Sequence, residues 1–141
     1  MREESESFIQ QSSLMWLNNN YGLIKHEPNR WMMFSIPNEL AMGIRSALLE
    51  LKLPERLINQ AIALALKKAK NTGFTPGVSD AIVMAPSGVT LYIEFKTKIG
   101  RQSDEQIEFQ RRCELLGHKY YLCRSLLEFQ SIIKSNNIVT L

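Results

Sequence analysis

Seven consecutive residues, Thr-Leu-Tyr-Ile-Glu-Phe-Lys at positions 90–96, alternate between side chains that belong in a core and side chains that tolerate water. Successive side chains of a β-strand point to opposite faces, so this period of two predicts a strand with one buried face. The odd-numbered residues are expected in the core. Glu94 and Lys96 therefore project together from the opposite face, as a carboxylate and an amine two residues apart.

The segment before this strand predicts its pairing partner. Residues 80–84, Asp-Ala-Ile-Val-Met, form a second strand pattern, and Pro86-Ser87-Gly88 between the two segments favours a short loop. We expect an antiparallel hairpin. In that arrangement, Asp80 can approach the same point as Glu94 and Lys96.

Helical patterns surround the hairpin. Pro54 is acceptable in a first helical turn but not inside a helix, so residues 38–70 divide into two helices. Ser103 is suited to cap a later helix whose first turn is acidic, and Gly117 is suited to end it. The remaining expected elements are a helix to about Asn20, strands near Leu23-Ile24 and from Trp31 to Ile36, a strand from Lys119 to Cys123, and a helix from Ser125 to about Ser135.

The second helix of the 38–70 pair is apolar on most of its circumference from Leu57 to Leu66. This pattern indicates burial on more than one side, either in the core or against a second subunit. Three aromatic residues in the first part of the chain could stack on nucleic-acid bases, but core packing is the expected role. They are Trp16, Trp31 and Phe34.

The size of the chain, 141 residues with 45% hydrophobic side chains, suits one domain with a real core, which we place at 1–141. No apolar run is long enough for a membrane span, and the acidic start does not resemble a signal peptide, so we expect an intracellular protein without a membrane partner. It would act in the cytoplasm or nucleoid, or in a host cell if viral. Cys113 and Cys123 are expected to be free thiols, and their spacing makes a structural zinc site improbable.

The net charge of +3 is mild, but its distribution is uneven. Residues 1–59 contain six Lys or Arg and seven Asp or Glu, whereas residues 60–125 contain ten and six. The second half is therefore the one expected to face a polyanion. The basic side chains that could grip phosphates are Lys98, Arg101, Arg111, Arg112 and Lys119.

The grouping of Asp80, Glu94 and Lys96 suits phosphodiester hydrolysis. Carboxylate oxygens are the ligands that Mg²⁺ or Mn²⁺ prefers, and the backbone carbonyl of Phe95 could supply a third oxygen. Lys96 could orient or deprotonate the attacking water and offset negative charge in the transition state. A lone Glu-x-Lys is more often a solvated pair on a strand, so the hypothesis depends on the wider order of motifs.

That wider order resembles the VRR-NUC family of the PD-(D/E)XK nuclease superfamily, most closely between Gly73 and Phe129. The family pattern has two glycines, Pro-Asp, a hairpin, Glu-x-Lys, a glycine, Ser-x-x-Gln, and a glycine before a strand. Ser79 replaces the usual proline. The matching residues in this chain are Gly73, Gly77, Asp80, Glu94, Lys96, Gly100, Ser103, Gln106 and Gly117.

The resemblance implies an α/β restriction-endonuclease-like core, in which a mixed sheet is flanked by helices, with residues 38–70 as a helical insertion. It implies that Gln106 positions substrate or water near the active site. An acidic residue of the first helix can add to the metal site in this family, and Glu6, one turn before Gln10, is the candidate.

Small stand-alone members of the family resemble homodimeric resolvases that cut four-way DNA junctions, and two symmetric cuts require two active sites. The same fold could instead cut flaps or other branched DNA, or bind nucleic acid without catalysis. The intact Asp80, Glu94 and Lys96 favour an enzyme over the last alternative.

Overall fold

The computed structural model describes residues 3–21, 31–36 and 40–137. Its four strands form one sheet in the order β1 (Met32–Ser35), β2 (Ala81–Met84), β3 (Thr90–Phe95) and β4 (Lys119–Cys123). The expected hairpin is confirmed, because β2 and β3 pair antiparallel, with Ala81 opposite Ile93. The expected strand near Leu23-Ile24 and His26 lie outside the described residues.

The sheet is mixed, because β1 pairs antiparallel with β2 whereas β3 and β4 run parallel. Parallel neighbours need a crossover connection, which α4 (Asp104–Leu115) supplies between β3 and β4. As a result, the carboxyl ends of β3 and β4 lie at the same edge as the start of β2. The expected α/β fold, a mixed sheet flanked by helices, is confirmed.

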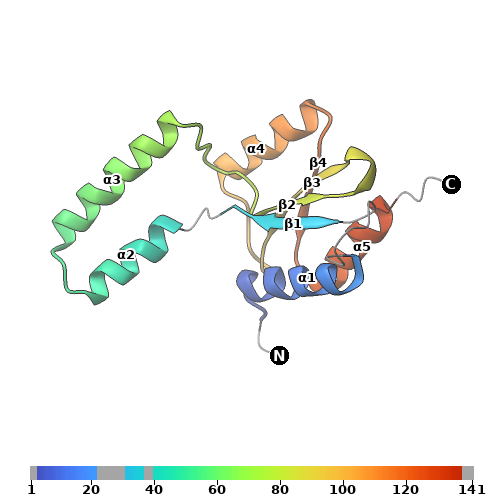
Figure 1. Ribbon diagram of the computed structural model, residues 1–141, viewed down its shortest axis with the longest axis horizontal. Coiled ribbons are helices and arrows are strands. Elements are labelled where there is room, and N and C mark those ends of the chain that lie inside the picture. Colours follow the sequence, from blue (N-terminus) through green and yellow to red (C-terminus); the bar gives the residue numbers. More distant parts are fainter. Residues whose placement is uncertain (1–2, 22–30, 37–39, 138–141) are drawn as a thin grey trace.

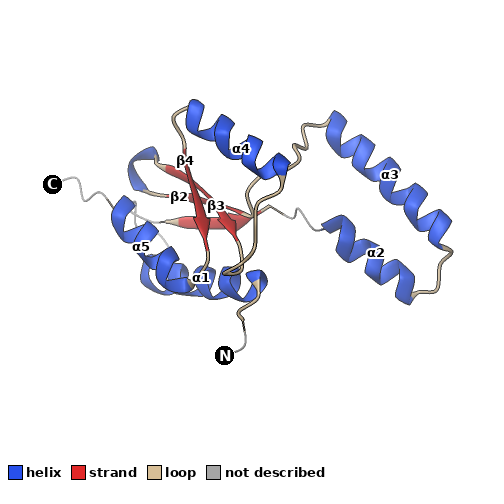
Figure 2. Ribbon diagram, turned by 180° about the vertical axis from the view of Figure 1, so that it is seen from behind, coloured by secondary structure: helices blue, strands red, loops and turns tan. Residues whose placement is uncertain are grey.

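Helices cover the two faces of the sheet unequally (Figures 1 and 2). The helices α1 (Glu6–Tyr21) and α5 (Leu126–Asn136) pack together across one face, and α4 lies on the other, against β4. The core lies on the α1 and α5 side. There Phe129 is fully buried, with its ring centroid 6.2 Å from those of Phe95 and Trp16.

The expected core face of the second hairpin strand is confirmed, because Leu91, Ile93 and Phe95 are completely buried. Trp31 is also buried, with its ring centroid 5.7 Å from that of Tyr21. Free thiols are confirmed as well: two buried cysteines occur in the described part of the chain, and both are unpaired.

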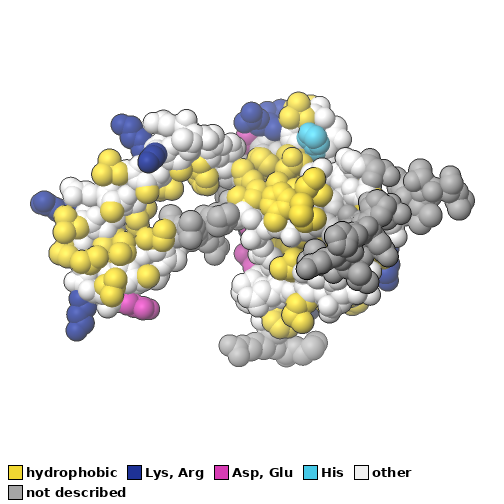
Figure 3. All heavy atoms as spheres, in the orientation of Figure 1, with side chains coloured by type: hydrophobic (Ala, Val, Ile, Leu, Met, Phe, Trp, Pro, Cys, Tyr) yellow, Lys and Arg dark blue, Asp and Glu magenta, His cyan; other side chains and the backbone are white. Residues whose placement is uncertain are grey.

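The expected core position of Phe34 is wrong, because its side chain is 42% exposed. Residues alternate along β1, so Phe34 and Met32 point to the face opposite Met33, and Met33 is the one that joins the core. Figure 3 shows hydrophobic side chains gathered on the surface over β1 and β2. We attribute the exposure to the position of α4. This helix covers the same face of the sheet as Phe34, but it packs against β4 at the far edge and leaves β1 uncovered.

Two helices, α2 (Leu40–Glu50) and α3 (Glu55–Asn71), lie between β1 and β2 in the chain, and Pro54 precedes the second as expected. They pack on each other and project away from the sheet (Figures 1 and 2). A place for α3 in the core is therefore ruled out: Ile58 is its buried residue, whereas Leu57 and Leu64 are 51% and 68% exposed. The apolar circumference reflects contact with α2 on one side and an open surface on the other.

None of the helices in the described ranges is long and apolar enough to cross a membrane.

Candidate active site

The end of β3 and the start of β2 bring two acidic residues to one edge of the sheet. Ala81 pairs with Ile93, so Asp80 lies next to the backbone that follows Ile93. The contact is direct, because the Phe95 backbone N–H donates to Asp80 Oδ2 at 2.7 Å. The N–H and C=O of one strand residue point to the same side, so the Phe95 carbonyl also faces the side of Asp80.

Glu94 is the centre of the site. Its side chain is completely buried, and its Oε1 accepts hydrogen bonds from Lys96 Nζ at 2.8 Å and from Gln106 Nε2. Glu94 Oε2 is also buried and has no hydrogen-bond partner among the described residues. One oxygen is thus held by two donors, whereas the other is buried without a donor from the described residues.

Lys96 is mostly buried, and its amine lies between two carboxylates. Besides the contact with Glu94, Lys96 Nζ lies 3.9 Å from Glu6 Oε1 on α1. The Lys96 backbone N–H donates to the Cys123 carbonyl at 3.0 Å, which ties the end of β3 to β4. The structure therefore places the amine on the same side of the sheet as Glu94.

Gln106 is oriented by the cap of α4. Ser103 Oγ accepts the Gln106 backbone N–H at 3.3 Å, and Gln106 Oε1 accepts the Ser103 backbone N–H at 2.9 Å, which completes a capping box. The amide nitrogen of the same side chain donates to Glu94. The capping box at the start of α4 thus directs the Gln106 amide group toward the buried Glu94 carboxylate.

Burial raises the pKa of Glu94 to about 7, and the negative charge of Asp80 adds to the rise while the hydrogen bond from Lys96 opposes it. Burial alone would lower the pKa of Lys96, but the hydrogen bond and charge of Glu94, with the charges of Glu6 and Asp80, raise it. Lys96 is therefore protonated at neutral pH, and Glu94 is near its titration midpoint.

Asp80 and Glu94, with the Phe95 carbonyl, are the groups that could hold a divalent cation. The described residues contain no cluster of three His, Cys, Asp or Glu suited to a metal, so any further ligands would be backbone, water or phosphate oxygens, as Mg²⁺ accepts. Glu6 lies at the edge of the site and contacts Lys96. This contact makes Glu6 a partner of the amine, and a role as metal ligand stays a prediction.

Arg124 was not singled out from the sequence, yet it holds the loop that follows β3. Its Nη1 donates to the carbonyls of Thr97 and, at 2.8 Å, Gly100. The Arg124 backbone N–H donates to Glu128 Oε2 at 2.6 Å. This loop joins Lys96 to the cap of α4, so Arg124 helps to fix the distance between Lys96 and Gln106. No local motif marks this role, because the carbonyls that the Arg124 guanidinium binds lie more than 20 residues away.

The basic residues expected to grip phosphates do not gather in one place. Lys98 and Arg101 are exposed just after β3, beside the site. Arg111 and Arg112 are exposed on α4, where Arg111 Nη2 lies 2.7 Å from Glu108 Oε1. Lys119 Nζ donates to Asn136 Oδ1 at 2.6 Å at the opposite end of β4, away from the site, so its contact with a phosphate stays a prediction. His118 packs its ring on Tyr92, which fits a structural role.

Comparisons with known proteins bear on the fold. No protein-family model matches this chain, and no curated protein does. A solved structure described as a VRR_NUC domain protein is similar, with a TM-score of 0.64 and 15% sequence identity. The match covers 97% of this chain and 91% of that one. The chain therefore has a VRR-NUC-like fold, as its motifs predicted.

Gly77 should be required for the position of α4. It has a φ of +76°, and a Cβ at this position would lie 2.3 Å from the backbone of Glu105. Gly73 also has a positive φ, +100°, but a Cβ there meets nothing within 4 Å. We expect Gly77→Ala to lower the free energy of unfolding by about 1–3 kcal/mol more than Gly73→Ala, because only the former adds a clash. Urea denaturation of both variants would measure this, and equal losses would contradict it.

The raised pKa of Glu94 should make stability depend on pH in the metal-free protein. The Glu94 carboxyl has a pKa of about 7 in the folded state and an ordinary value of 4.5 in the unfolded chain, so unfolding releases a proton between these two pH values. The stabilisation is therefore complete below about pH 4.5 and is lost as the pH rises through about 7. Urea denaturation in chelator from pH 5 to 8 should show this fall in the wild type but not in Glu94→Gln. The exposed control Glu108→Gln should keep it.

Proposed function

We propose that this protein is a metal-dependent DNA endonuclease that hydrolyses phosphodiester bonds. The observation that carries the proposal is the state of Glu94: its carboxylate is completely buried, one oxygen is held by Lys96 and Gln106, and the other has no hydrogen-bond partner in the described part of the chain. A buried charged oxygen without a partner is costly. A cation at Glu94 Oε2 would remove that cost.

The donor set fits Mg²⁺ or Mn²⁺. Asp80, Glu94 and the Phe95 carbonyl offer hard oxygen atoms, and the described residues place no thiolate or imidazole among them. When bound, such a cation supplies positive charge that polarises the scissile phosphate and acidifies the attacking water. Gln106 and Lys96 keep the Glu94 carboxylate in one orientation.

Lys96 is the residue that we assign to charge balance during the reaction. Attack of water on the phosphorus atom builds negative charge on the phosphate oxygens before the P–O bond to the leaving group breaks. An ammonium group held between Glu94 and Glu6 at the same edge can offset that charge. Lys98 and Arg101, exposed on the following loop, are positioned to contact phosphates that flank the cut.

Within this proposal, branched DNA is the substrate and a four-way junction is the preferred form. The support is the resemblance to small VRR-NUC proteins, together with the projecting α2–α3 pair. The described part of one chain offers one such site, so paired cuts need two copies. The exposed apolar face of α3, which includes Leu57 and Leu64, is the surface that we assign to contact between them.

Cleavage should need both the cation and Lys96. Incubation with labelled flap and four-way DNA should give products in Mg²⁺ or Mn²⁺ and none in chelator, and linear DNA should be cut more slowly than either. We expect Lys96→Ala to lower the cleavage rate by about 100-fold or more while DNA binding is kept, because the amine stabilises charge in the transition state. Lys134→Ala, an exposed change on α5, is the matched control and should cut normally. Cleavage that survives chelation or Lys96→Ala would overturn the nuclease proposal.

The assembly should depend on α3. Leu64→Glu places a charge on a side chain that is 68% exposed, so it should leave the monomer folded and prevent an apolar contact between copies. We expect the wild type to elute as a dimer and to cut four-way junctions in pairs, and the variant to elute as a monomer that makes single nicks. Leu127→Glu, at a similarly exposed position on α5, is the control. A monomeric wild type that cuts flaps faster than junctions would favour a flap nuclease instead.

A further inference from the structure

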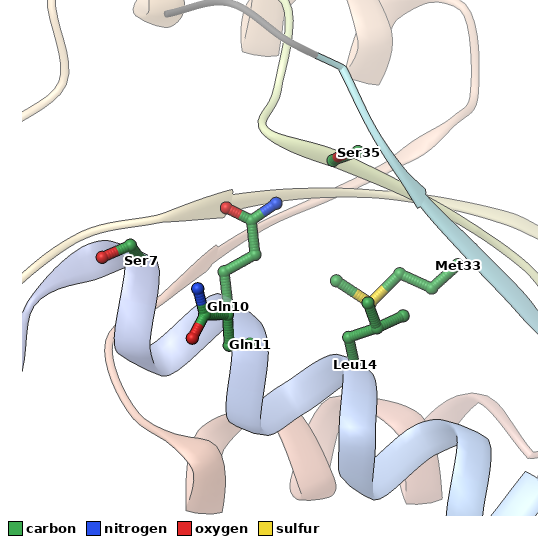
Figure 4. Close-up of a pocket in the computed structure, with 6 residues that line it drawn as sticks. All are labelled: Ser7, Gln10, Gln11, Leu14, Met33 and Ser35. Carbon is green, nitrogen blue, oxygen red and sulfur yellow. The ribbon is translucent and has the colours of Figure 1, made fainter. Parts of the chain in front are cut away.

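A cavity of about 290 Å³ lies between α1 and β1. The helix contributes Ser7, Gln10, Gln11 and Leu14, and the strand contributes Met33 and Ser35. In Figure 4, the glutamine side chains lie between the two serines, and the Leu14 and Met33 side chains point toward one another beside them. All six residues are uncharged, so the cavity is unlike the adjoining site with its carboxylates and amine.

The lining limits what the cavity can bind. A phosphate would find no cation there, and a metal ion would find no carboxylate or imidazole. The carboxamides of Gln10 and Gln11 make no hydrogen bond to another described residue. A wholly apolar ligand would bury them without a partner, which costs free energy. The lining suits a flat, neutral molecule with apolar faces and an edge that carries both donors and acceptors.

We propose that this cavity binds an unpaired nucleobase of the DNA substrate. A glutamine amide offers one donor and one acceptor side by side, which matches two neighbouring groups on a base edge. The Leu14 and Met33 side chains can contact the face of the base. The inference rests on the proposed function, because it takes DNA as the ligand. It adds that this DNA must present an unpaired base near the cut.

The position of the cavity connects it with the cut. Ser7 follows Glu6, whose carboxylate lies 3.9 Å from Lys96 Nζ, and Gln10 is one helical turn further along α1. One turn advances about 5 to 6 Å, so a base in the cavity belongs to a nucleotide close to the cleaved phosphate. A base in an intact duplex is paired and stacked and cannot enter. Entry costs least where the DNA is already single-stranded, so the cavity would favour branched DNA over plain duplex.

The test measures binding in chelator, so that it does not depend on cleavage. Two flap DNAs differ at one unpaired nucleotide beside the branch, which carries either 2-aminopurine or no base. For the wild type, we expect a change in 2-aminopurine fluorescence on binding and an affinity about tenfold weaker for the abasic DNA. The double variant Gln10→Ala, Gln11→Ala should bind both DNAs with the weaker affinity and leave the fluorescence unchanged.

The control is Gln60→Ala, the same change at an exposed position of α3, which should behave as the wild type. Alanine is the best helix former, so these variants should keep α1 and α3 intact, which circular dichroism would verify. Equal affinities of the wild type for the two DNAs would overturn the inference, as would the same discrimination in the double variant. If discrimination holds but no DNA is cut in Mg²⁺ or Mn²⁺, the base site stands and the nuclease proposal fails.

Discussion

The burial of the Glu94 carboxylate is the constraint on which the site depends. A carboxylate in an apolar sheet is tolerated only where donors or a cation compensate for the lost water. Lys96 and Gln106 both donate to Oε1, and burial still raises the pKa to about 7. A bound cation would therefore stabilise the buried Glu94 carboxylate. Such an arrangement is typical of a metal-binding site, whereas it does not stabilise an apolar core.

Several separate elements are needed to hold this one group. The strand β3 provides Glu94 and Lys96, the start of β2 provides Asp80, and the capping box of α4 turns Gln106 toward the carboxylate. Arg124 fastens the loop between β3 and α4 by its bonds to backbone carbonyls. A small displacement of α4 should therefore change the hydrogen bonding of Glu94, because the Gln106 side chain both closes the helix cap and contacts the Glu94 carboxylate.

Local patterns were sufficient for most of the elements and for the centre of the site. Alternation in β3 placed Glu94 and Lys96 on one side, the hairpin brought Asp80 to them, and Ser103 marked the start of α4. Local patterns were insufficient for side chains whose neighbours are distant in the chain. The apolar circumference of α3 did not reveal that Leu64 would be exposed, and Lys119 gave no sign that Asn136 would bind it.

The sequence by itself determined which residues face each way along β3, where α3, α4 and α5 begin, and which acidic and basic groups could share an edge of the sheet. These properties follow from backbone periodicity and capping, which act over a few residues. Only the tertiary structure decided that Glu94 is wholly buried, that Glu6 reaches Lys96, and that an uncharged cavity lies between α1 and β1. These properties depend on how elements far apart in the chain pack together. Short-range sequence patterns carry no information about the distances between such elements.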